Sequence, residues 1–212
     1  MCTGRIDLAF ILRAFSQGAD GVFIGGCWPG ECHYITEGNY EALSNTHLGK
    51  KLLTHIGVDP ERLTLQWIAA SEGSRFAEVT TEFVQKLKAL GPLSGDEEPE
   101  ARRLKRALES VGKLVPYLKL VERERMRVAD KSEQAYEDFF GSDEFRRLFD
   151  SLIADKLAIS QITSLLADGP LSTVEIADSL SLSPSAVSKH MNSTSRQGLV
   201  TYDVDQRRYA LA

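Results

Sequence analysis

Three cysteines are the residues of this sequence whose type and placement could carry chemistry. Cys2, Cys27 and Cys32 all lie within the first 32 of 212 residues, and the rest of the chain contains no cysteine. A secreted disulfide framework is usually shorter, richer in cysteine and even in cysteine number. Clustered thiols in an odd number therefore favour metal or redox chemistry in a reducing compartment.

The loop Cys27-Trp-Pro-Gly-Glu-Cys32 has the spacing C-x4-C and directly follows two glycines. This spacing occurs in ferredoxin-type [2Fe–2S] binding, and glycines let backbone N–H groups approach bound sulfur. Two thiols in an ordinary core are the alternative, but Trp, Pro and Glu between the cysteines are unlike core residues. His33 follows the loop, either as a residue that contacts or ligates a cluster or as a structural residue.

Helix and strand patterns alternate through the first 93 residues, which is typical of a parallel α/β sheet. Asp7 and Arg5 are expected to cap and orient the first helix. Because the chain opens directly before a helix, where such a fold normally has a strand, we expect an N-terminally incomplete sheet. Loops at strand ends are where α/β sheets place their sites, so the C-x4-C loop is well placed. The predicted helices are residues 6–15, 39–56 and 72–90, and the predicted strands are residues 21–26 and 62–70.

The distribution of charge divides the chain into three segments, which we predict as domains. Residues 1–93 carry 10 acidic and 8 basic side chains, residues 94–150 carry 14 and 12, and residues 151–212 carry 6 and 5. Within the middle segment, residues 94–100 are predicted as a linker, and residues 101–131 as a charged helix or helix pair broken near Pro116. The apolar stripe of these helices either packs against a neighbouring element or docks a partner.

The last segment has the pattern of a helix-turn-helix followed by a hairpin. Leu-Ser-x-x-Glu-Ile-Ala and then Ser-Pro-Ser-x-Val-Ser-Lys-His resemble the winged helix of bacterial repressors of the ArsR and MarR type. The resemblance implies a recognition helix over residues 185–197 and a wing over residues 201–210. Residues 151–212 carry a net charge of −1, which disfavours DNA as the partner of this segment and favours a role in docking another protein. The DNA-facing candidates are Ser185, Ser188, Lys189, His190, Ser193, Arg196, Arg207 and Arg208.

A second resemblance covers residues 1–93 almost throughout. Cys2-Thr-Gly-Arg-Ile-Asp, Gly26-Cys-Trp-Pro-Gly-Glu-Cys-His-Tyr34 and Trp67-Ile-Ala-Ala-Ser-Glu-Gly resemble the delta subunit of methyl-viologen-reducing hydrogenase. The resemblance implies a non-catalytic iron–sulfur subunit with Cys2, Cys27 and Cys32 as cluster ligands. It also implies partners: a hydrogenase or formate dehydrogenase, and the flavin subunit of a heterodisulfide reductase-type, electron-bifurcating complex.

This sequence departs from the family pattern at its start. Family members normally begin about 35–40 residues earlier, with a strand and a cysteine-rich element. A [2Fe–2S] cluster needs four protein ligands, and this chain has three cysteines. We expect either a fourth ligand from an upstream segment or a chain without a cluster. A wrongly assigned start at Met1 is our hypothesis, and translation of the DNA upstream of Met1 tests it.

The remaining features narrow the functional class. The net charge of −5, the lack of a signal peptide and the lack of a long apolar run predict a cytoplasmic protein without a membrane span. Paired carboxylates, a Ser/His/Asp set and a G-x-G-x-x-G loop are not recognisable at useful spacings. We therefore predict a three-layer α/β electron-transfer domain, N-terminally incomplete, followed by charged helices and a winged-helix domain. The alternative is a redox-responsive winged-helix transcriptional regulator.

Overall fold

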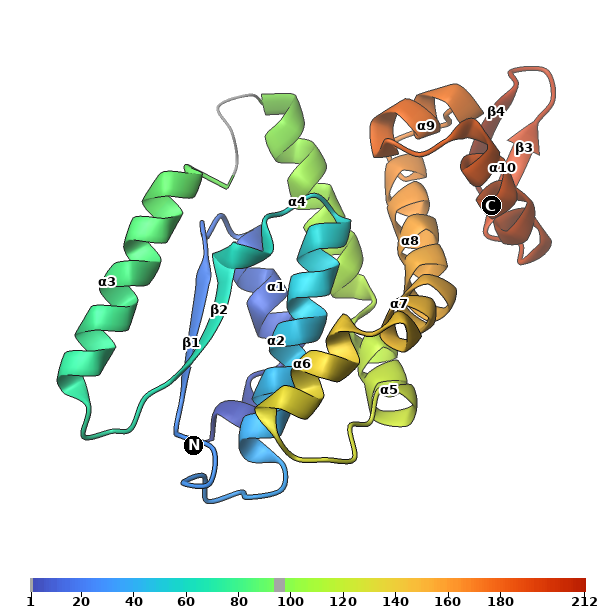
Figure 1. Cartoon of the computed structure of the whole chain (residues 1–212). Helices are drawn as coiled ribbons and strands as arrows, with labels where there is room; N and C mark the ends of the chain where they lie inside the picture. Colours follow the sequence, from blue (N-terminus) through green and yellow to red (C-terminus); the bar gives the residue numbers. More distant parts are fainter. Residues whose placement is uncertain (1, 94–97) are drawn as a thin grey trace.

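The computed structural model describes residues 2–93 and 98–212, so the predicted linker lies partly outside the described residues (Figure 1). Helices and strands alternate in the first segment, as the hydrophobic pattern predicts. Asp7 caps the first α-helix, because its side chain accepts a hydrogen bond from the backbone N–H of Ala9. The elements are the 3₁₀ turn η1 (Thr3–Arg5), α1 (Leu8–Ser16), β1 (Val22–Gly26), α2 (Gly38–His55), the 3₁₀ turn η2 (Pro60–Arg62), β2 (Leu63–Trp67) and α3 (Gly73–Leu90).

Strands β1 and β2 form a parallel sheet in which Val22 is opposite Leu63 and Gly26 is opposite Trp67. Successive side chains of a strand point to opposite faces, and β1 shows the consequence. The ring of Phe23 contacts the ring of Phe83 on α3, with centroids 5.8 Å apart. The next residue, Ile24, is buried in the core that α1 and α2 form on the opposite face. The predicted three-layer arrangement is therefore confirmed in part, around a sheet of two strands among the described residues (Figure 1).

The charged helices of the middle segment pack into the same core as the first segment. Leu108, Val111 and Leu118 are each at most 2% exposed and lie in one buried cluster with residues of α1 and α2. The apolar stripe thus packs against neighbouring helices, and the alternative that it docks a partner is wrong. Pro116 stands in the first turn of the second helix, where its missing N–H costs no hydrogen bond. These helices are α4 (Glu98–Lys113), α5 (Val115–Arg125), α6 (Glu133–Gly141) and α7 (Asp143–Phe149).

A continuous helical stretch leads from α7 into the last segment. A short π-helical turn (Asp150–Ala154) joins α7 to α8 (Asp155–Leu166) without a break. Phe149 and Ile153 on this stretch are buried in the first core, whereas Ile162 and Leu166 are buried in a second one. One helical rod is therefore shared by both cores.

The second core belongs to a helix-turn-helix followed by a hairpin (Figure 1). Ser172 and Glu175 form a capping box at the start of α9 (Thr173–Leu180), and α10 (Pro184–Arg196) follows. Strands β3 (Val200–Asp203) and β4 (Arg208–Leu211) pair antiparallel as the wing. In the described part of the chain, no helix is long and apolar enough to cross a membrane.

Candidate metal centre

The three cysteines meet at the carboxyl end of β1. Cys27 is the first residue after that strand, Cys32 lies in the loop that leads to α2, and Cys2 immediately precedes η1. This position agrees with the rule that parallel α/β sheets place their sites in loops after the strands. The sequence predicted such a loop for Cys27 and Cys32, and the packing of η1 against α2 brings Cys2 to it.

The distances between the sulfur atoms are short. Cys2 Sγ lies 3.6 Å from Cys32 Sγ, and Cys27 is close enough to Cys32 for the two thiols to shift each other's pKa. Two thiolates that share one tetrahedral metal ion, with bonds of about 2.3 Å, lie about 3.8 Å apart. The Cys2 and Cys32 sulfurs therefore have nearly the separation that a shared metal ion requires.

Backbone donors favour a thiolate at Cys32. Burial of this side chain, which is 4% exposed, raises its pKa. Hydrogen bonds from the backbone N–H groups of Tyr34 and Asn39 and from the other two thiols outweigh burial, so the net pKa of Cys32 is lowered. The pKa of Cys27 is raised instead, by burial and by its hydrogen bond with Cys32. Because the thiolate is the form that binds metals, Cys32 is better prepared than Cys27 to bind one.

Gly38 leaves the space that the sulfurs occupy. A Cβ atom at Gly38 would lie 2.3 Å from Cys32 Sγ and 2.8 Å from Cys2 Sγ, far closer than real contacts allow. A Cβ at Gly4 would lie 2.6 Å from the carbonyl oxygen of Gly38, so η1 also approaches α2 backbone to backbone. The sulfurs thus sit against bare backbone at the first residue of α2.

Hydrogen bonds from neighbouring elements hold the C-x4-C loop in place. Trp28 Nε1 donates to Glu72 Oε2 across 2.8 Å, and the guanidinium of Arg75 lies over the Trp28 ring at 4.9 Å from its centroid. The side chain of Asn39 donates to the carbonyl oxygen of Cys27. Thr3 Oγ1 donates to the carbonyl oxygen of Gly25 across 3.0 Å, which fixes the segment that carries Cys2. These contacts connect the C-x4-C loop to α2 and to the start of α3, and they connect the segment that carries Cys2 to the end of β1.

The residues present fit an iron–sulfur group as a partial set of ligands. Three thiols, backbone N–H donors and a glycine cradle are the surroundings that such a group needs. A [2Fe–2S] cluster has four protein ligands, however. In residues 2–93 and 98–212, no group of three or more His, Cys, Asp or Glu side chains is arranged so that it could hold a metal ion.

His33 and Arg5 lie at the edge of this site. His33 is exposed, and its ring stacks edge-on against Tyr34 with centroids 5.2 Å apart. Arg5 lines a pocket next to Cys2. Sequence reasoning did not single out Gly38, Asn39 or Glu72, because their roles depend on contacts between segments that are distant in the sequence.

The structure separates the residues predicted to face DNA. Ser185, Lys189 and Arg196 are exposed on α10, whereas His190 is 7% exposed and buried in the interior. Burial lowers the pKa of His190, Asp155 opposes this effect and Lys189 adds to it. Lys189 Nζ is 3.1 Å from Asp155 Oδ2. The other candidates are Ser188 and Ser193, both half-buried on α10, exposed Arg207 on the wing, and Arg208, which pairs with Glu175 at 2.8 Å.

Comparison with known protein families gives two matches along the chain. Residues 1–91 match the methyl-viologen-reducing hydrogenase delta subunit family. Residues 160–202 match the bacterial regulatory protein family named for arsR, which confirms the resemblance of α9 and α10 to these repressors. The two matched ranges do not overlap.

Proteins similar to this chain include iron-sulfur subunits of hydrogenases and a protein of a heterodisulfide reductase. The chain is 54% identical over 91 residues to the iron-sulfur subunit of the F420-non-reducing hydrogenase of Archaeoglobus profundus, covering 43% of this chain and 66% of the relative. It is 37% identical over 93 residues to the iron-sulfur subunit of the vhu F420-non-reducing hydrogenase of Methanopyrus kandleri, covering 44% and 70%. One protein of the ferredoxin:CoB-CoM heterodisulfide reductase of Methanosarcina mazei is 45% identical over 96 residues, covering 45% and 12%.

The matched residues thus span about two thirds of the hydrogenase iron-sulfur subunits and a small part of the reductase protein. They contain η1 to α3, the elements that bring the three cysteines together. Through these residues, the chain belongs to the methyl-viologen-reducing hydrogenase delta subunit family.

Proposed function

We propose that this protein is a non-catalytic electron-transfer subunit that holds a [2Fe–2S] cluster through Cys2, Cys27 and Cys32. The 3.6 Å separation of the Cys2 and Cys32 sulfurs, beside a glycine whose Cβ would displace both, is the observation that carries the proposal. When bound, such a cluster accepts and donates single electrons. The protein supplies the thiolates, the backbone donors and the rigid loop, and the cluster requires one ligand besides the three cysteines.

The proposed partners follow from what the relatives are named. Some relatives are by name the iron-sulfur subunits of F420-non-reducing hydrogenases, and others belong by name to heterodisulfide reductases. We place this chain between a hydrogenase or formate dehydrogenase and the flavin subunit of a heterodisulfide reductase-type, electron-bifurcating complex in the cytoplasm. The winged helix is proposed as the module that attaches the chain to such a complex.

Metal analysis of the full chain tests the cluster. The protein is purified anaerobically, reconstituted with iron and sulfide, and examined by EPR after reduction. We expect two iron and two sulfide per chain, as a [2Fe–2S] cluster contains. Cys27→Ser and Cys32→Ser should abolish the signal, and His33→Ala should retain it because that ring is exposed and faces Tyr34. Absence of bound iron, or cysteine variants with an unchanged spectrum, would refute the proposal.

A redox-responsive transcription regulator is the second candidate, and the match of residues 160–202 to the arsR family favours it. The charges of the candidate DNA face argue against it. Lys189 and Arg208 are engaged by Asp155 and Glu175, and the wing carries exposed Asp203 and Asp205. Fluorescence anisotropy with labelled duplex DNA at low and at high salt (about 50 and 200 mM), on oxidised and reduced protein, separates the two functions. Binding that changes with oxidation and weakens steeply with salt would establish the regulator.

A further inference from the structure

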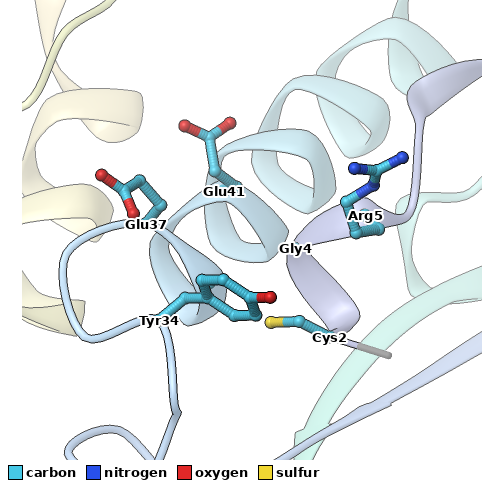
Figure 2. Close-up of a pocket in the computed structure, with 7 residues that line it drawn as sticks. Cys2, Gly4, Arg5, Tyr34, Glu37 and Glu41 are labelled. Carbon is cyan, nitrogen blue, oxygen red and sulfur yellow. The ribbon is translucent and has the colours of Figure 1, made fainter.

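A pocket of about 380 Å³ opens beside the cysteine sulfurs, between η1 and the start of α2 (Figure 2). Cys2 lies at its base together with Gly4 and Gly38, which have no side chains to cover the sulfur. Tyr34 forms one wall and is 55% exposed. The Cys2 sulfur is therefore the part of the proposed centre that lies nearest to the surface on this side.

The rim of this pocket combines negative charge with apolar surface. Glu41 lines it from the first turn of α2, Glu37 lines it from the residue just before that helix, and Arg5 lines it from η1 (Figure 2). Within residues 2–93 and 98–212, neither glutamate forms an ion pair. Among the residues that line the pocket, the two glutamates therefore outnumber the one arginine.

The apolar side chain that lines this pocket is Tyr34, and the next residue in the chain, Ile35, is exposed. Ile35 is 70% exposed, among the most exposed large apolar side chains of the described chain. Apolar side chains in the centre of a contact with charges around it are the usual composition of a protein interface. An exposed aromatic side chain in the pocket that contains Cys2, followed in the chain by an exposed aliphatic one, thus makes this face suitable for docking a protein.

We propose that this pocket is the docking site of a redox partner protein that presents a basic side chain next to an apolar one. The inference rests on the proposed function and adds the surface through which electrons enter or leave. The basic group meets Glu37 and Glu41, and the apolar group packs on Tyr34 and Ile35. Contacts between electron-transfer proteins are small and rely on charge for their association rate, which agrees with a pocket of this size.

Reoxidation kinetics test the charge complementarity. The reconstituted protein is reduced with dithionite, freed of excess reductant and mixed with a positively charged c-type cytochrome or with hexacyanoferrate(III). Each acceptor takes one electron per molecule from the reduced centre, and no proton is transferred. We expect the double variant Glu37→Gln/Glu41→Gln to slow cytochrome reduction about 3- to 10-fold at low salt, because steering by opposite charges is lost. Reduction of the hexacyanoferrate anion should become faster, and both effects should vanish at about 1 M salt.

Matched variants separate docking from general charge effects. Glu82→Gln/Glu109→Gln removes the same charge from exposed positions on α3 and α4, and should leave both rates unchanged. Ile35→Ser should slow the cytochrome and not the small anion. Equal rates for wild type and Glu37→Gln/Glu41→Gln, or an equal effect of the control pair, would overturn the inference. A wild-type protein without iron would overturn the proposed function as well, and the iron analysis identifies that case.

Discussion

Replacement of Gly38 by alanine tests the sulfur arrangement most directly. The added Cβ would lie 2.3 Å from Cys32 Sγ, whereas ordinary contact begins near 3.4 Å. One of the two atoms must move by about 1.1 Å, several times the roughly 0.2 Å that ligand distances tolerate in a metal site. Overpacking of this kind costs about 1–3 kcal/mol. For a chain of this length, a cost of about 2 kcal/mol lowers Tm by about 4–8 °C.

Two measurements on the same protein check this prediction. Thermal unfolding under reducing conditions should show the loss of stability, and iron per chain after reconstitution should fall well below the wild-type value. Gly112→Ala is the matched control, because its Cβ meets no atom within 4 Å and alanine favours the interior of α4. A Gly38→Ala protein that keeps both its Tm and its iron would show that the crowding argument is mistaken.

Three further predictions concern the packing around the site and the winged helix. Burial raises the pKa of Glu122 above its ordinary value. The stability that protonated Glu122 contributes is therefore fully present below about pH 4.5 and is lost as the pH rises through the higher folded-state pKa. In urea unfolding, Glu122→Gln should be more stable than wild type at pH 7, and this difference should disappear near pH 4. Burial lowers the pKa of His190 below 6.5, so stability is lost as the pH falls below that value. The protection factors of amides in α10, which correct for the slower intrinsic exchange at low pH, should therefore be smaller at pH 5 than at pH 7. His190→Gln should remove the contribution of this titration. Leu108 is 2% exposed in the core shared with α1, so Leu108→Ala should cost about 2–5 kcal/mol in urea unfolding, and a loss below about 1 kcal/mol would contradict the shared core.

Most elements near the centre were predictable from local pattern. Predicted strands at residues 21–26 and 62–70 correspond to β1 and β2, and the predicted helices correspond to α1, α2 and α3 within about two residues. The meeting of the cysteines needed the resemblance, because no spacing within the chain shows that Cys2 approaches Cys32. The role of Gly38 could not be predicted for the same reason, because a glycine at the start of a helix usually indicates only a turn.

The middle segment shows where pattern reasoning stops. Its apolar stripe was predicted to pack against a neighbouring element or to dock a partner, and Leu108 and Val111 are buried in the core shared with α1, a neighbour that the pattern did not identify. Helices α6 and α7 were not predicted, although Phe145 and Phe149 pack in the same core. Charge density describes the outer face of a helix and not what its apolar face contacts. The buried His190 was likewise hidden among polar neighbours, because its orientation depends on how α10 packs against α8 and α9.

The unbroken helical stretch from Asp143 to Leu166 has a mechanical consequence. At about 1.5 Å per residue it is a rod roughly 36 Å long, anchored at one end among the aromatic rings of α7 and at the other in the small bundle of α9 and α10. A tilt of about 5° at the first anchor would move the far end by about 3 Å. A structural change that reorients the helix near α7 would consequently displace the helix-turn-helix at its other end.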